Sequence, residues 1–185
     1  MNILKPELFF DSNSGALSGK HIGEKTARIR DLKGIFINES ARAALPQDQL
    51  VYHVQYYFPV SENTEGGLFF GNTTIYPGKV GDEYFMTKGH FHAKSDRSEY
   101  YWCILGKGIL LFMDRKRKTW AEEMTPGSLH YLPAHVAHRT VNVGITPMVF
   151  GACWPSDAGH DYGTIASEGF SARLLERNGK PELVG

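Results

Sequence analysis

The chain has 185 residues, of which 42% are hydrophobic, and its 20 basic side chains balance 20 acidic ones. This length and composition are typical of one folded domain with a sizeable core, and the zero net charge argues against electrostatic capture of nucleic acid or of an anionic membrane surface. No apolar run approaches the roughly 18 residues of a membrane span. Together with the zero net charge, this leads us to expect no membrane partner and no nucleic-acid partner.

The N-terminus and the cysteines predict a cytoplasmic protein. MNILKPELFFDSNSG contains no apolar core followed by a small-residue cleavage site, so we expect no signal peptide. Cys103 and Cys153 have no paired spacing, which is typical of reduced core thiols in a reducing compartment.

Helix-forming residues are concentrated in the first 49 residues, which we expect to form an N-terminal extension of helix and strand packed on the rest of the chain. Asn38 is a suitable N-cap, and the helix formers after it continue up to Pro46. The sequence therefore predicts a short helix here and only a few short helices in all.

From residue 50 onward the chain consists of short segments rich in β-branched and aromatic residues, separated by turn signals. The expected strands cover residues 50–58, 68–76, 100–105, 108–113, 128–132, 140–143 and 148–154. Asn178-Gly179 is a strong hairpin signal, so residues 173–185 are expected to form a C-terminal hairpin or tail. Short strands without intervening helices indicate an all-β antiparallel sandwich or barrel.

The stretch TKGHFHAKSDRSEYY places two histidines and a glutamate close together. Side chains alternate along a strand, so His90 and His92 point to one face and Phe91 to the other if this segment is extended. The turn AKSDR then reverses the chain, which lets Glu99 return to the same face. Imidazoles combined with a carboxylate suit Fe, Mn, Ni or Zn, so the pattern predicts a metal site.

A further ligand must come from far along the chain, where YLPAHVAHRTVNV offers His135 and His138. We favour His138, because it adjoins the alternating RTVNV in which a strand begins, but the pattern leaves the choice open. The alternative interpretation is that these histidines are ordinary surface or hydrogen-bonded residues. His-x-His with a nearby Glu and a later His is much less expected by chance than a single histidine.

Three cations near this cluster are interpreted differently. Lys88 shares a face with His90 on an unbroken strand, which would place it inside the site. Lys94 and Arg97 fall in the exposed turn and are expected to be solvated.

Longer runs of the sequence resemble a known family. GHFH, Glu99 and PGSLHYLPAHVAH resemble the paired metal motifs of the cupins, small β-barrels with the metal inside. TTIYPGKVGDEYFMTKGHFHAKSDRSE and AHRTVNVG…WPSDAGHDYGTIASEGF closely resemble the cupin-type glucose-6-phosphate isomerase family, and the likeness covers about residues 50–172.

The resemblance implies one cupin domain over residues 1–185, a jellyroll barrel with its core at about residues 50–172 that is usually a homodimer. It implies interconversion of glucose 6-phosphate and fructose 6-phosphate in glycolysis or gluconeogenesis. One divalent metal ion per subunit is expected, with Fe²⁺ preferred and Zn²⁺, Mn²⁺ or Ni²⁺ as alternatives. The metal ligands of the family fall on His90, His92, Glu99 and His138.

The substrate contacts of the family fall on Tyr52, Thr73, Thr87, the backbone around Gly89, His160 and Tyr162, and we add Lys88 and Trp154 to this expected set. The family commonly has a tyrosine at the position of Trp154, so an indole N–H that only donates replaces a hydroxyl. Phosphate binding there is expected to use the indole as a donor.

Aldose–ketose isomerisation moves hydrogen between C1 and C2 while negative charge builds on an oxygen, which a divalent metal stabilises as a Lewis acid. We expect Glu99 to carry the proton through a cis-enediol, and we assign His160 to catalysis beside it. A hydride shift is the alternative, because a metal-bound carboxylate is a poor base. Alternative functions are another cupin metalloenzyme reaction such as oxygenation, or a non-catalytic sugar-binding barrel.

Overall fold

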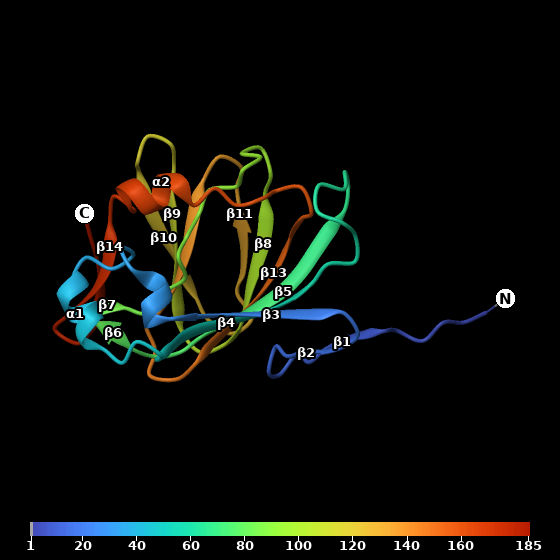
Figure 1. Cartoon of the computed structure of the whole chain (residues 1–185), viewed down its shortest axis with the longest axis horizontal. Coiled ribbons are helices and arrows are strands. Elements are labelled where there is room, and N and C mark those ends of the chain that lie inside the picture. The colour runs from blue at the N-terminus through green and yellow to red at the C-terminus, as the bar shows by residue number, and fades with distance from the viewer. Residues whose placement is uncertain (1) are drawn as a thin grey trace.

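Strands dominate the regular structure in the computed structural model, which describes residues 2–185. The larger layer is a six-stranded antiparallel sheet (Figure 1). Its strands, in spatial order, are β11 (Leu129–Leu132), β8 (Glu99–Leu105), β13 (Met148–Pro155), β5 (Leu68–Ile75), β4 (Leu50–Tyr57) and β3 (Ile22–Arg28).

The second layer is a three-stranded sheet with the order β10 (Thr119–Met124), β9 (Gly108–Met113) and β12 (Ala137–Asn142). The segment 85–90 runs along the free edge of β12. Thr87 N–H donates to the Thr140 carbonyl at 3.0 Å, and His138 N–H donates to the His90 carbonyl at 3.1 Å. The histidine segment is therefore attached to the sheet that carries His138.

The remaining strands form two smaller sheets. The strands β15 (Lys180–Val184), β14 (Arg173–Arg177), β7 (Glu83–Tyr84) and β6 (Lys79–Val80) form one sheet, and β1 (Leu8–Phe10) pairs with β2 (Leu17–Gly19). The β14–β15 hairpin turns at Asn178 and Gly179, both of which have positive φ, as a tight hairpin turn of this twist requires. The β1–β2 ribbon lies on the six-stranded sheet, where the Phe10 ring contacts those of Phe70 and Trp102. In Figure 1 the segment before β1 extends away from the other strands.

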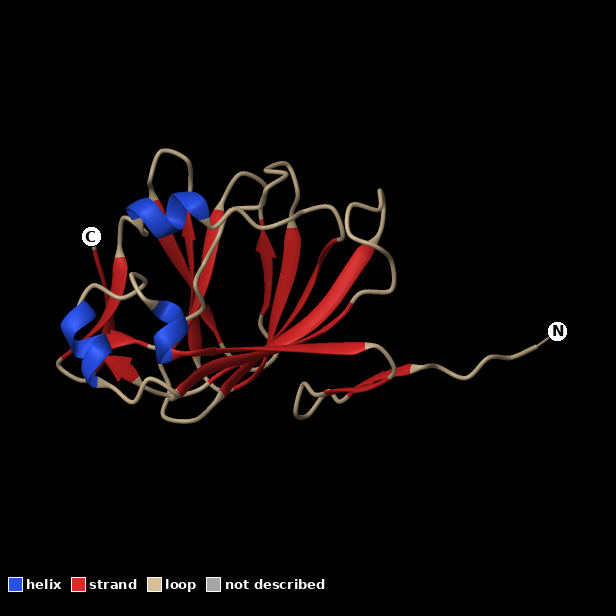
Figure 2. Cartoon of the chain, viewed as in Figure 1, coloured by secondary structure: helices blue, strands red, loops and turns tan. Residues whose placement is uncertain are grey.

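Three short helices lie at one end of the molecule, beside the strands (Figure 2). They are η1 (Ile29–Leu32), α1 (Glu39–Ala44) and α2 (Gly163–Glu168). The predicted helix after Asn38 is confirmed, since the Asn38 side chain accepts a hydrogen bond from Ala41 N–H. Helix α2 was not predicted from the sequence. Among residues 2–185, no helix is long and apolar enough to cross a bilayer.

The core fills the space between the two layers with large apolar side chains. Phe85, Phe91 and Phe112 are among the largest fully buried ones, and burying such a side chain contributes about 1.5–3 kcal/mol. The all-β antiparallel prediction is confirmed, and all seven predicted strands exist. Among the strands whose ranges were not predicted, β3 and β10 are sheet edges with three consecutive exposed residues each, so they lack the apolar alternation that marks a strand in sequence.

Candidate active site

Four side chains with metal-ligating atoms converge at one end of the core. One ligand atom from each of His90, His92, Glu99 and His138 lies within 4.8 Å of the other three. The Oε1 atom of Glu99 lies 3.2 Å from Nε2 of His92 and 2.8 Å from Nε2 of His138. Glu99 begins β8 in the larger layer, and His138 lies in β12 in the smaller layer. His90 and His92 lie just before the turn that leads into β8. Both layers therefore contribute ligands.

The alternation predicted for the histidine segment holds at its C-terminal end only. Phe91 is 1% exposed and packs in the core, whereas His90 and His92 face the cluster. The unbroken strand on which the placement of Lys88 depended does not form, because Gly89 has a φ of +74° and interrupts the extended backbone. Beyond Gly89, single antiparallel β-bridges join His90 to His138 and Phe91 to Asp161.

Hydrogen bonding orients the ligands as it does in metal sites. Nδ1 of His92 lies 2.8 Å from the Arg97 carbonyl, which must accept its proton, so Nε2 is left to face the cluster. Nε2 of His138 is fully buried and lacks hydrogen-bond geometry toward any residue in 2–185, although Glu99 is close. Buried polar nitrogens are normally satisfied, so this atom fits a cation as its missing partner.

The charges of the cluster are strongly coupled. Burial would raise the pKa of Glu99, but His138 and His92 outweigh it and lower this pKa to about 2. The pKa of His90 falls well below its usual value, first because it is buried and then because His138, His160 and His92 surround it. For His92, burial is opposed by Glu99 and the Arg97 carbonyl, which raise its pKa. The cluster thus holds an ionised carboxylate among imidazoles.

Three imidazoles and a carboxylate form a donor set that fits Fe, Mn, Ni or Zn and leaves coordination positions open. His135, the other candidate, is exposed and lies outside the cluster, with Nδ1 3.2 Å from the Ser95 hydroxyl. Of the two histidines between which the sequence left a choice, only His138 can therefore join the other three.

A cavity of about 380 Å³ opens beside the cluster. It is lined by every substrate and catalytic residue expected from the sequence, namely Tyr52, Thr73, Thr87, Lys88, Gly89, Glu99, Trp154, His160 and Tyr162. His90 and His138 also line it, while His92 lies behind them. Lys88 reaches the cavity although the strand that was expected to carry it is broken.

The loop between β13 and α2 carries His160 and Tyr162 over the cluster. Two backbone hydrogen bonds between Phe91 and Asp161, at 3.1 and 2.8 Å, hold the loop against the histidine segment. The ring centroid of His160 is 4.4 Å from that of His90, and Tyr162 is stacked on His160. The Asp161 carboxylate accepts a hydrogen bond from Gly163 N–H at 2.9 Å.

Ion pairs hold the start of the same loop. Asp157 is 5% exposed and accepts from Nε and Nη2 of Arg97 at 2.9 and 2.8 Å, and from Nζ of Lys94 at 2.8 Å. The expectation that Lys94 and Arg97 are merely solvated is therefore wrong. Sequence could not reveal this, because the buried partner lies about 60 residues away.

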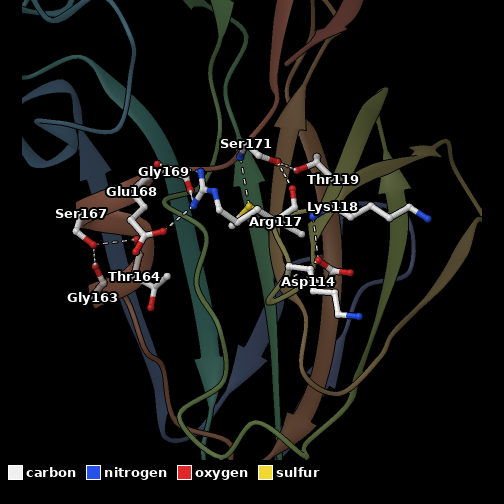
Figure 3. A network of polar contacts seen from close by, with 12 residues as sticks. Asp114, Arg117, Lys118, Thr119, Gly163, Thr164, Ser167, Glu168, Gly169 and Ser171 are labelled. Carbon is white, nitrogen blue, oxygen red and sulfur yellow. Dashed lines mark hydrogen bonds and ion pairs between the residues drawn. The ribbon is translucent and has the colours of Figure 1, made fainter.

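The other end of the loop is anchored through α2 (Figure 3). In the turn between β9 and β10, Arg117 donates to the Glu168 carboxylate at 2.8 Å, and its own carbonyl accepts from the Ser171 hydroxyl. That hydroxyl also lies 2.6 Å from the Thr119 hydroxyl. Both ends of the loop that carries His160 are thus attached to neighbouring elements.

Comparison with known proteins agrees with this arrangement. A family model described as "Glucose-6-phosphate isomerase (GPI)" matches residues 26–183. The chain belongs to the glucose-6-phosphate isomerase family. It is 48% identical to the glucose-6-phosphate isomerase of Thermococcus litoralis over 83% of this chain and 80% of that protein. It is 45% identical to that of Pyrococcus horikoshii over 94% of this chain and 91% of that protein.

The protein is therefore an isomerase built on the cupin fold, and the predicted cupin class is confirmed. Among solved structures, Peruvianin-I, described as a cysteine peptidase from Thevetia peruviana latex, superposes with a TM-score of 0.50 at 21% identity. The match covers 62% of this isomerase and 68% of that chain, and it shows a shared fold only.

Four polar residues that line the isomerase cavity were missed from the sequence, namely Lys25, Tyr56, Asn72 and Tyr101. Tyr101 lies two residues after Glu99 on β8, so strand alternation would have placed it on the same face. Burial and the Glu99 carboxylate raise the pKa of Tyr101 well above its usual value. Lys25 lines the cavity from β3, opposite Val54 in register. No signal pointed to Lys25, because its strand was not predicted.

Proposed function

We propose that this isomerase interconverts glucose 6-phosphate and fructose 6-phosphate at one divalent cation per subunit, held by His90, His92, Glu99 and His138. Fe²⁺ is the first candidate, and Zn²⁺, Mn²⁺ and Ni²⁺ suit the same donors. The observation that carries the proposal is the convergence of these four ligands on the wall of a polar cavity. A cation there would supply Lewis-acid stabilisation of negative charge on a substrate oxygen.

Substrate binding is supported by the donors around the cavity. The hydroxyls of Tyr52, Thr73 and Thr87, together with the Lys88 ammonium, line it and can donate to a phosphate group. Trp154 adds an indole N–H, so the departure from the tyrosine of the family preserves a donor. The cavity falls within the usual size range of small-molecule sites, which supports a bound hexose phosphate.

Glu99 is proposed as the base that carries the proton between C1 and C2 through a cis-enediol. Both imidazole contacts involve its Oε1 atom, which leaves Oε2 as the oxygen to take the proton. The low pKa of Glu99 keeps it ionised at neutral pH, as a base must be before the reaction. A hydride shift is the competing route.

His160 is proposed as the group that exchanges protons with the substrate hydroxyls. Burial is the largest influence on its pKa and lowers it from the usual value, so the ring is neutral at neutral pH. A neutral imidazole both donates and accepts a proton. Its ring lies against that of His90, one of the proposed ligands, and Tyr162 packs against both rings.

An anaerobic assay tests the proposal. Chelator-treated protein is supplied in turn with Fe²⁺, Mn²⁺, Zn²⁺ or Ni²⁺ and with fructose 6-phosphate, and glucose 6-phosphate is measured. We expect turnover without oxygen that depends on added metal. Oxygen consumption would favour an oxygenase, and sugar phosphate binding without turnover after reconstitution would favour a non-catalytic barrel.

A further inference from the structure

The histidine segment contains a bulge directly opposite Arg139. Thr87 pairs with Thr140, and His90 pairs with His138, so Lys88 and Gly89 together face one residue of β12. Such a two-against-one arrangement leaves backbone groups unpaired, and bulges often lie beside active sites. One group left without a backbone partner here is the Lys88 carbonyl.

The side chain of Arg139 satisfies that carbonyl. Its Nε and Nη2 donate to the Lys88 oxygen at 3.2 and 2.5 Å. Arg139 is 2% exposed, and the carboxylate of Glu83 is paired with Arg173 at 3.0 Å instead. A buried cation whose strongest contact is a peptide oxygen is costly, which calls for a specific role.

This contact determines where the next N–H points. In a trans peptide the carbonyl and the following N–H point in opposite directions, and residues 2–185 contain no cis peptide bond. Arg139 does not line the cavity, whereas Gly89 does. With the Lys88 oxygen held toward Arg139, the Gly89 N–H is directed into the cavity. This N–H donates to no acceptor within the described residues.

The packing around the bulge leaves little freedom for another arrangement. The guanidinium carbon of Arg139 lies 4.6 Å from the centre of the Phe170 ring. A Cβ atom on Gly89 would lie 2.8 Å from Phe170 and 3.1 Å from both Cβ and Nε of Arg139. Only glycine fits here without displacing the arginine, so the bulge and Arg139 depend on each other.

We infer that Arg139 is a positioning residue that orients the Lys88–Gly89 peptide so that the Gly89 N–H binds the phosphate group of the substrate. The guanidinium also polarises this peptide, which strengthens the N–H as a donor to an anion. The inference rests on the proposed hexose phosphate substrate. It means that Arg139, which is buried and lies outside the cavity, contributes to the affinity for phosphate.

The test uses Arg139→Met, with Arg42→Met as the matched control. Arg42 is also buried and also donates to a backbone carbonyl, that of Ile29, but it belongs to α1. Loss of one hydrogen bond to a charged group should raise KM for fructose 6-phosphate and the dissociation constant of inorganic phosphate about tenfold in Arg139→Met. In Arg139→Met we expect kcat and metal per chain to stay within about twofold of the wild type. Arg42→Met should change neither KM for fructose 6-phosphate nor the dissociation constant of inorganic phosphate.

Chemical rescue separates positioning from general destabilisation. In Arg139→Ala, ethylguanidinium added to the metal-loaded protein should restore phosphate affinity, and Arg139→Lys, which keeps the charge, should fall between the wild type and Arg139→Met. Unchanged phosphate affinity in Arg139→Met, or in Arg139→Lys if the other variants do not fold, would overturn the inference. An equal loss in Arg42→Met would do the same. Because phosphate binding is measured without turnover, a wild type that binds phosphate yet fails to isomerise refutes the proposed function alone.

Discussion

At the scale of single residues, Glu99 belongs both to the histidine cluster and to the wall of the cavity. One of its oxygens contacts the imidazoles of His92 and His138, and its side chain also lines the cavity. The spacing of His90, His92 and Glu99 could be read from the sequence, because strand alternation and one turn bring them to the same face. The broken backbone at Gly89 could not, because it depends on the packing of Arg139 and Phe170 from distant segments.

Replacing Glu99 by Gln tests its proposed role. The amide keeps the shape and one oxygen but cannot take up a proton, so Glu99→Gln should retain part of the metal and lose about 10²-fold or more in kcat. Metal per chain and kcat are measured on the same preparations. A near-normal rate would remove Glu99 as the base.

The fate of the transferred hydrogen distinguishes the two routes. If Glu99 carries a proton, turnover of fructose 6-phosphate in D₂O should place deuterium at C2 of glucose 6-phosphate, because the carboxyl proton exchanges with solvent. Mass spectrometry or NMR of the product measures the label. Product free of deuterium would assign the reaction to a hydride shift.

At the scale of elements, the loop between β13 and α2 is the part of the site with the least regular structure and the most anchors. The residues of its binding motif were recognised in the sequence, but the ion pairs that hold it were not. Asp157 is separated from Lys94 and Arg97 by about 60 residues, and only the fold brings them together. Local patterns of charge therefore gave the wrong interpretation of both cations.

The ion pairs of Asp157 predict a specific pH dependence of stability. Arg97 is the largest influence, with Lys94 next, and together they lower the pKa of Asp157 below its usual value of about 3.9. A carboxyl whose pKa is depressed on folding contributes stability that is fully present above its unfolded pKa and is lost as the pH falls through its folded pKa. The contribution should thus be complete at pH 7 and 5 and should decline below about pH 4.

Urea unfolding of wild type and Asp157→Asn at pH 7, 5, 4 and 3 measures this contribution. The wild type should be more stable at pH 7 and 5, and the difference should shrink toward pH 3, because the unfolded wild type then takes up a proton that the unfolded Asp157→Asn variant cannot. A difference that stays constant across this range would show that the ion pairs are not its source.

At the scale of the whole molecule, the central strands were predictable and the edges were not. Strands such as β5, β9 and β13 are buried and apolar, so their composition marks them, whereas β3 and β10 have long exposed stretches. The six-stranded sheet also has an apolar outer face. Tyr100 and Tyr131 are paired across β8 and β11, and Leu129 beside them is 67% exposed.

This outer face fits the homodimer that the family resemblance implies, since contiguous exposed apolar residues mark interaction surfaces. A charge on this face should weaken association, so we expect the wild type to have twice the mass of the chain and Leu129→Glu to shift toward monomer. Ile145→Glu is the control, because Ile145 is 95% exposed in the turn between β12 and β13. Light scattering measures the mass, and a monomeric wild type would contradict the proposal.

The central claim of the account is that four converging ligands hold the cation on which isomerisation depends. Metal per chain and isomerase rate, measured together in wild type, His138→Ala and His135→Ala after reconstitution with Fe²⁺, test it most directly. The account predicts that His138→Ala loses both the metal and the rate, while His135→Ala, altered at the neighbouring histidine outside the cluster, retains both. Full metal content and a normal rate in His138→Ala would contradict it.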